Sequence, residues 1–512
     1  MVASSQPLAV AAAINTLRSG GNAIDAAVTA TLVLMVVEPM STGVGGDCFG
    51  LIYPVKEKRL IGLNASGRAP SGISVETLLQ RGITRMPLEG PLSVTVPGAL
   101  DGLAQCLARF GTITLREALL PAVFYAENGF PVSEIVAQMW ESGANKLKNN
   151  PESKRVYLPN GRSPLAGELF RNPDLAHTLR LIGEQGRGVL YAGEIGEVLV
   201  RAVQELKGLL SLTDMSDHVS DWVEPIKTDY RGFEVFEMPP NNQGLAALLA
   251  LNIVENYRLF EMGHNTAEYL HHLIEAMKLA LADARDKIAD AGEPINLDEL
   301  LSEKHAQAQR ALINPQTARN VVDRIAEREP GDTVYVAVVD EEGNVVSLIS
   351  SLFKAFGSGV TAPGTGLLLQ NRGSGFNLEP QHPNSVGPGK RPYHTIMPGM
   401  IMRDDRPWVC FGVVGGTMQP QGHLQVVCNL IDFNMDAQSA LDAPRFRVLE
   451  DGKLALEDGI ADNVRSQLCA MNHHIRSAST EEGFGGGQAI LISEGTLYGG
   501  SDPRKDGCAL GY

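Results

Sequence analysis

The chain of 512 residues has a net charge of −16, with 44% hydrophobic and 20% charged residues. That hydrophobic content is enough for a large buried core and is untypical of disordered chains. The acidic excess is dispersed along the sequence and disfavours a nucleic-acid or anionic-membrane surface, so we expect neither partner.

The six cysteines lie far apart without a CxxC pair, which favours isolated thiols. The eleven histidines show no metal-ligand spacing, because the neighbours in His271-His272 and His473-His474 point to different sides of a helix or strand. We therefore predict no metal and no cofactor. The longest apolar run, residues 26–37, is too short to cross a bilayer, and no basic segment precedes it, which predicts a cytoplasmic protein.

Helices and strands are interleaved in the first part of the chain. The pattern predicts two helices within residues 5–39, separated by Gly20-Gly21, and then a hairpin over residues 47–66. Residues 117–209 are mainly helical in pattern. A strand, a turn and a helix follow over residues 230–257, and a long amphipathic helix over residues 267–290. Residues 301–330 are charged and poorly periodic, so we expect them to be exposed.

The second part is richer in strands. Residues 333–349 alternate in the manner of a β-hairpin, with a turn over residues 341–344. Two helices are predicted near residues 420–433 and 461–473. A helical first part and a strand-rich second part that share one core indicate a layered fold of helices and strands.

Several glycine clusters raise the possibility of a nucleotide site. Residues 43–50, 356–366 and 483–490 lack the GxxxxGK[ST] pattern, so turns explain them better than a nucleotide-dependent enzyme does. Gly415-Gly416 differs, because a strand leads into it and a helix follows. Adjacent glycines at a helix start present successive backbone N–H groups, which suits the binding of a developing oxyanion.

Many stretches of the sequence occur in the order found in one known family, and together they are far more specific than any single motif. The matching stretches are "MVASSQPLAVAAAINTLRSGGNAIDAAV", "SVTVPGALDGL", "AENGFPVS", "EMPPNNQG", "EAMKLALADARD", "DTVYVAVVDEEGNVVSLISS", "FGSGV", "VGPGKRP", "GGT", "DAPRF" and "LYGGSDPRKDG". Over nearly its whole length the chain resembles the γ-glutamyltranspeptidase family of N-terminal-nucleophile hydrolases.

The resemblance implies an α+β fold, a four-layer αββα sandwich of the N-terminal-nucleophile hydrolase type. It also implies that the precursor cuts its own chain between Asp332 and Thr333. Residues 1–332 would form a large, helix-rich chain, and residues 333–512 a small chain that carries the nucleophile. The two would remain one intertwined domain, as a heterodimer or as a dimer of such heterodimers.

The chemistry explains why a threonine is required at the cut. A Thr hydroxyl needs a base at neutral pH, and cleavage turns the amide nitrogen of Thr333 into an α-amino group with a pKa of about 8. Ser351 occupies the position of a second family threonine that hydrogen-bonds the nucleophile. Gly415 and Gly416 match the glycines of the family's oxyanion hole.

The substrate pocket departs from the family pattern. The family holds the donor α-carboxylate with an arginine before an "AP" pair, but here that position is Ser66 and the nearest arginine is Arg68. "QNRGSGFN" places Asn371 and Arg372 where the family has "NNQ", and Gly375 where an aspartate binds the α-ammonium. His394 and Thr395 replace a serine pair, and Phe353 replaces an asparagine.

A site without its acidic anchor, but with an added arginine, favours an acyl group that ends in a carboxylate, such as glutaryl. We therefore expect an amidohydrolase or acyltransferase that cleaves γ-glutamyl or glutaryl-type amides of small molecules through an acyl-threonine. It resembles glutathione hydrolases and the cephalosporin-acylase branch. The short lid segment favours hydrolysis over transfer. The alternative is an unprocessed, inactive member that serves as a binding or scaffold protein.

Overall fold

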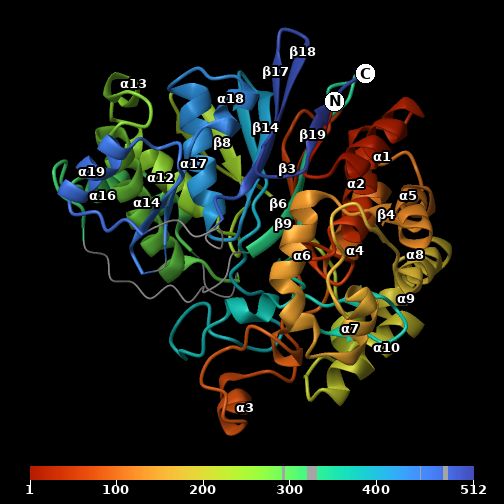
Figure 1. Cartoon of the computed structure of the whole chain (residues 1–512). Helices are drawn as coiled ribbons and strands as arrows, with labels where there is room; N and C mark the ends of the chain where they lie inside the picture. The colour runs from red at the N-terminus through yellow and green to blue at the C-terminus, as the bar shows by residue number, and fades with distance from the viewer. Residues whose placement is uncertain (291–294, 320–330, 450, 477–482) are drawn as a thin grey trace.

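The protein combines helices with antiparallel sheets, as a computed structural model of the chain shows (Figure 1). The structure describes residues 1–290, 295–319, 331–449, 451–476 and 483–512. Within these ranges the two larger sheets have seven and six strands. The helices gather in two groups on opposite sides of the strands, and β1 pairs with β19, so that the two ends of the chain lie side by side (Figure 1).

The helices before Thr333 are α1 (Pro7–Arg18), α2 (Ala23–Val37), α3 (Val75–Gln80), α4 (Ala99–Phe110), α5 (Leu115–Asn128), α6 (Glu134–Leu147), α7 (Pro151–Tyr157), α8 (Pro173–Gln185), α9 (Gly188–Tyr191), α10 (Glu194–Glu205), α11 (Leu212–Ser216), α12 (Gly244–Val254), α13 (Leu259–Met262), α14 (Ala267–Lys287), α15 (Leu297–Leu300) and α16 (Glu303–Arg310). Those after it are α17 (Met418–Ile431), α18 (Ala437–Asp442) and α19 (Asp462–Ala470).

The first sheet has the order β19 (Cys508–Leu510), β1 (Val2–Ser4), β9 (Gly331–Val339), β10 (Val345–Lys354), β2 (Asp47–Tyr53), β3 (Ile61–Ala65), β6 (Asp221–Val223). The second has the order β18 (Thr496–Ser501), β17 (Gly486–Ser493), β14 (Arg406–Val414), β13 (Gly399–Arg403), β8 (Phe233–Glu237), β7 (Ile226–Tyr230). Three two-stranded sheets pair β4 (Phe130–Pro131) with β5 (Leu169–Phe170), β11 (Thr361–Ala362) with β12 (Leu367–Leu368), and β15 (Phe446–Val448) with β16 (Leu454–Leu456).

Strand β9 is buried on both faces, and the alternation of its side chains explains how. Val334, Val336 and Val338 belong to a core shared with the helices that include α1, α2 and α4. Tyr335 and Ala337 point the other way, into a core shared with strands of the second sheet. Because successive side chains of a strand face opposite sides, one short segment contributes to both cores.

The second sheet is covered on its other face by helices. Residues of α12, α14 and α17 form a further core with Val235, Ile401, Val409, Phe411 and Val413 of β8, β13 and β14. Strand β14 therefore lies between the intersheet core and these helices. It runs directly into the glycine pair that precedes α17.

Most elements predicted from the sequence are present. The two N-terminal helices, the hairpin of β2 and β3, the strand–turn–helix of β8 and α12, the long α14 and the hairpin of β9 and β10 are confirmed. The sequence did not predict α18, which has only six residues, nor α16 within the poorly periodic segment expected to be exposed. Residues 320–330 of that segment lie outside the described residues. The six cysteines are free thiols. None of the described helices has the length and apolar character needed to cross a membrane.

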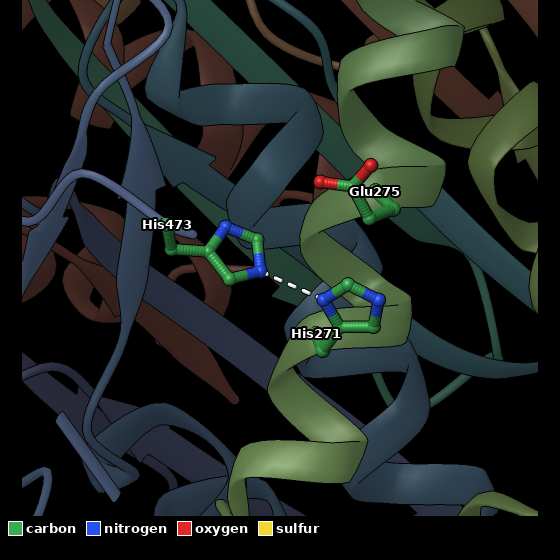
Figure 2. Close-up of side chains that lie close together, drawn as sticks. All are labelled: His271, Glu275 and His473. Carbon is green, nitrogen blue, oxygen red and sulfur yellow. Dashed lines mark hydrogen bonds between the residues drawn. The ribbon is translucent and has the colours of Figure 1, made fainter. Parts of the chain in front are cut away.

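A buried polar link joins parts of the chain that lie on either side of Thr333. His271 and Glu275 are one turn apart on α14, and His473 follows α19, with the two imidazoles pointing toward each other (Figure 2). His271 Nδ1 lies 2.8 Å from His473 Nε2, and His271 Nε2 lies 2.8 Å from the carbonyl oxygen of Asn314. The carbonyl can only accept, so Nε2 of His271 carries the proton and His473 donates to Nδ1.

Acid should destabilise the folded protein at this link. Burial, followed by the positive charge of Lys278, lowers the pKa of His473 to about 3. Below the unfolded value of about 6.5 the unfolded chain takes up a proton that the folded chain refuses, so stability falls as the pH falls from 6.5 toward 3. Between pH 6.5 and 4, the free energy of unfolding should therefore decrease less for His473→Gln than for the wild type. Urea titrations at each pH measure this difference.

The exposed neighbour His474 provides the matched control, since His474→Gln should keep the wild-type dependence on pH. The buried histidines that do not contact His473 keep their surroundings in all three proteins and cancel in the comparison, and the new Gln amide can still donate to Nδ1 of His271. Identical slopes in the wild type and His473→Gln would show that His473 titrates normally.

Candidate active site

Thr333 is the third residue of β9, and the strand runs without interruption through the peptide bond before it. The sequence led us to expect that Thr333 opens the strand. In the uncut chain it does not, because Gly331 and Asp332 pair with Lys354 and Phe353 of β10. Thr333 itself is 1% exposed. The peptide bond that the resemblance marks for cleavage is therefore held within a sheet.

A bulge in β10 faces this peptide bond. The register between β9 and β10 shifts between Ser350 and Phe353, and Phe353 has a φ of 84°. Positive φ is uncommon for a bulky residue and is found where surrounding structure enforces it, often at functional sites. The bulge leaves the Ser351 hydroxyl 2.7 Å from the Asp332 carbonyl oxygen, to which it donates, while the N–H of Phe353 donates to Ser351 Oγ at 2.7 Å. A hydrogen bond from Ser351 to the Thr333 side chain stays a prediction.

Gly415 and Gly416 form the turn between β14 and α17. Their φ values are 120° and 62°, a region that favours glycine. A Cβ at Gly415 would lie 3.0 Å from the Cα of Gly485, and one at Gly331 would lie 2.9 Å from the Cα of Gly416. The turn thus packs directly against the start of β9. Both glycines are buried, and neither N–H donates a hydrogen bond to another group in the described part of the chain.

Arg372 and Thr395 lie beside the bulge. Arg372 begins the short turn Arg372–Gly375 and is fully buried. Its guanidinium donates to Thr395 Oγ1 at 2.8 Å and to Ser351 Oγ at 3.4 Å, and it covers the Phe353 ring at 4.1 Å. The structure thus joins Thr395, Arg372 and Ser351 by hydrogen bonds, and Ser351 in turn donates to the carbonyl of Asp332.

His394 is also buried, but it faces a different partner. Its Nε2 lies 3.0 Å from Oδ2 of Asp47, while Oδ1 of Asp47 accepts from the N–H groups of Gly67 and Gly98 and from the Gln370 amide. Burial and then the charge of Arg372 lower the pKa of His394 to about 3, against the effect of Asp47. The imidazole is neutral at physiological pH and belongs to the network of hydrogen bonds around Asp47.

Asn371 and Arg68 are held by other parts of the protein. Asn371 donates to the carbonyl of Leu88 at 2.7 Å and accepts from the N–H of Lys354 at 3.1 Å. Arg68 is partly exposed and pairs with Asp290 at 3.3 Å and with Asp221 at 3.6 Å. No contact of the described structure joins Arg68 or Asn371 to Thr333.

The residues that position these groups were missed in the sequence, although their motif was noted. In "EMPPNNQG" the amide of Gln243 donates to the carbonyl of Gly416 at 3.0 Å and to that of Thr395. The amide of Asn242 donates to the carbonyl of Ile396, and that of Asn241 to the carbonyl of Pro392 at 2.7 Å. Three successive buried amides after two prolines are the signal that could have indicated this role.

One group of described residues has the composition of a metal site. His271, Glu275 and His473 offer ligand atoms within 4.8 Å of one another (Figure 2). The two facing nitrogens already share a hydrogen bond, and Glu275 pairs with Lys278 at 2.7 Å and accepts from the N–H of Arg319 at 2.9 Å. Because Lys278 compensates the carboxylate, the donor set fits a hydrogen-bonded link better than a dication.

Known proteins resemble this chain along its whole length. The glutathione hydrolase-like YwrD proenzyme of Bacillus subtilis (strain 168) is 37% identical over 100% of this chain and 98% of its own length. The acylase ACY 1 proenzyme of Pseudomonas sp. (strain SE83) is 34% identical over 99% and 92%. The crystal structure of cephalosporin acylase from Bacillus halodurans matches with a TM-score of 0.93 at 39% identity, over 99% of this chain and 94% of that one. A family model described as gamma-glutamyltranspeptidase matches residues 9–512, and the chain belongs to this family of hydrolases.

Proposed function

We propose that the protein is a self-processing amidohydrolase that uses Thr333 as its nucleophile. The observation that carries the proposal is the hydrogen bond from Ser351 Oγ to the carbonyl oxygen of Asp332. Such a donor polarises the carbonyl that an adjacent hydroxyl must attack. Membership of a family whose relatives include proenzymes supports the same conclusion. The three cores of the structure agree with the four-layer αββα arrangement that we propose for the fold.

Self-cleavage proceeds by an N→O acyl shift. Thr333 Oγ attacks the carbonyl carbon of Asp332 and gives up its proton, the C–N bond breaks, and the nitrogen of Thr333 takes up the proton as an amine. Water then hydrolyses the ester, which leaves a carboxyl group on Asp332 and a free hydroxyl on Thr333. Residues 1–332 and 333–512 become separate chains.

Turnover uses the groups that cleavage has released. The α-amine of Thr333 takes the hydroxyl proton as Oγ attacks the substrate amide. The substrate carbonyl must then lie where the carbonyl of Asp332 lay, since both donate an acyl group to the same oxygen. The buried N–H groups of Gly415 and Gly416 are the backbone donors for the oxyanion. Water releases the acyl group, and hydrolysis is favoured over transfer.

The preferred acyl group ends in a carboxylate, of the glutaryl or γ-glutamyl type. Arg372 donates to the Ser351 hydroxyl, which in turn donates to the carbonyl of Asp332. The hydroxyl of Thr395 accepts a second hydrogen bond from the guanidinium and so fixes its position. A buried guanidinium binds a carboxylate strongly because the competing solvent is excluded. Asn371 and His394 keep their amide and imidazole in protein contacts and shape the wall behind Arg372. Arg68 lies in an ion-pair cluster with acidic residues.

Self-cleavage gives the first test. The purified wild type should separate under denaturing conditions into two chains, the smaller beginning Thr-Val-Tyr-Val. Thr333→Ala should stay uncut because the acyl shift needs the hydroxyl, whereas Thr333→Ser should be cut. Mass spectrometry of both chains measures the result. Cleavage of Thr333→Ala at the same bond would contradict self-processing, and an uncut wild type would favour the inactive scaffold alternative.

A comparison of two neighbouring serines distinguishes polarisation of the Asp332 carbonyl from a general effect on packing. Ser351→Ala removes the donor to Asp332 and should slow cleavage by about 100- to 1000-fold, as loss of an oxyanion donor does. Ser350→Ala removes a buried hydroxyl that donates to the carbonyl of Asp47 instead, and should be cut at nearly the wild-type rate. Equal rates for the two variants would exclude the proposed role of Ser351.

The preference among acyl donors tests whether Arg372 binds the carboxylate of the acyl group. Arg372→Ala should lower kcat/KM for a glutaryl anilide by about 10- to 150-fold, the equivalent of roughly 1.5–3 kcal/mol for a charge-assisted contact, and hardly change it for a butyryl anilide. Arg68→Ala is the matched control and should leave the ratio of the two donors unchanged. If Arg372→Ala slows both donors alike, or if Arg68→Ala changes the ratio, Arg372 does not select the carboxylate.

A further inference from the structure

A buried acid–imidazole pair lies beside the glycine turn and takes no part in the chemistry described above. His423 is on α17, and its Nδ1 lies 2.6 Å from Oε1 of Glu237, the last residue of β8. The side chains of His423 and Glu237 are 1% and 0% exposed. Burial raises the pKa of the Glu237 carboxyl, an effect that His423 opposes. A pair so fully removed from water is expensive to bury and invites a functional explanation.

The imidazole replaces a missing strand partner. Strand β13 begins at Gly399, opposite Phe411, so residues 412–414 of β14 extend beyond it. On the other side β17 pairs Val413 with Gly487, but the N–H of Gly487 donates to Asp502 at 2.7 Å. This is a non-hydrogen-bonded pair, and the N–H of Val413 therefore points to the side that β13 has left. It donates to Nε2 of His423 at 3.2 Å.

These contacts fix the state of the ring. Since Nε2 accepts from a backbone N–H, the neutral imidazole carries its proton on Nδ1 and donates it to Glu237. The ring also packs against Phe411 at 4.7 Å between centroids. Gly399 leaves room for it, because a Cβ there would lie 3.1 Å from Cε1 of His423.

The glycine turn is consequently held at two points by one segment, residues 237–243. Glu237 acts through His423 on Val413, two residues before Gly415. Gln243, six residues later, holds the carbonyl of Gly416 directly. Both ends of the turn are tied to the loop that also carries the two prolines.

We propose that Glu237 and His423 are positioning residues, which hold the end of β14 so that the N–H groups of Gly415 and Gly416 meet the oxyanion. The proposal rests on the function proposed above and names a device within that same site. An oxyanion donor displaced by about 1 Å loses much of its effect, and such misplacements cost about 100-fold in rate. Ground-state binding of the donor does not depend on these N–H groups and should change little.

The test measures the acylation step of processed protein with a glutaryl anilide, as the pre-steady-state release of the aniline. His423→Phe keeps a ring beside Phe411 but cannot accept from Val413, and Glu237→Met keeps the length but cannot accept from His423. Both should slow acylation by about 10- to 100-fold, with the Kd of the anilide changed by less than about 3-fold. Glu237→Gln keeps an oxygen acceptor and should restore acylation to within about 3-fold of the wild type.

Asn429→Ala is the matched control for stability. Asn429 is buried on the same helix and donates to the carbonyl of Ala440 at 3.1 Å, away from the turn. It should lower the Tm without slowing acylation. The inference is overturned if His423→Phe and Glu237→Met acylate normally, if Glu237→Gln is as slow as Glu237→Met, or if Asn429→Ala is equally slow. A wild type that is cut but never acylated would instead overturn the proposed function, and this inference with it.

Discussion

The pairing of β9 with both of its neighbours is the constraint on which the site depends. Residues 334–339 pair with β10, and residues 336–338 also pair with β1. Their side chains are locked into two cores at once. The position of Thr333 is therefore set by the strand that follows it and does not require the peptide bond before it. A chain arranged in this way can lose that bond and still present the new N-terminus where the bond had been.

The same geometry explains why Ser351 and the glycine turn both lie beside the start of β9. In the uncut chain the bulge of β10 aims the Ser351 hydroxyl at Asp332, while the glycine turn packs against Gly331. The segment from Glu237 to Gln243 holds the turn and also donates to the carbonyl of Thr395, whose hydroxyl accepts from Arg372. In the function that we propose, processing, oxyanion binding and donor selection share this scaffold, although each uses different atoms.

Much of this organisation could be predicted from the sequence. Alternation identified the β9–β10 hairpin, adjacent glycines after a strand identified the turn, and the family resemblance singled out Thr333. Other features depend on contacts between distant segments. The bulge that turns Ser351 toward Asp332, the meeting of His271 with His473, and the contact of His423 with Val413 follow from where strands end and how helices cross. The local sequence pattern does not encode contacts of this kind. The expectation that Asn371, His394 and Arg68 contact the substrate therefore rests on the family resemblance alone.

The central claim is that Thr333 carries the acyl group during turnover. Processed protein should be mixed with a glutaryl anilide, quenched in acid within the first turnover, digested and analysed by tandem mass spectrometry. The account predicts that the added mass of one glutaryl group lies on the peptide that begins at Thr333, as an ester that hydroxylamine removes. An acyl group on any other residue, or turnover of the anilide with Thr333 unmodified throughout, would contradict it.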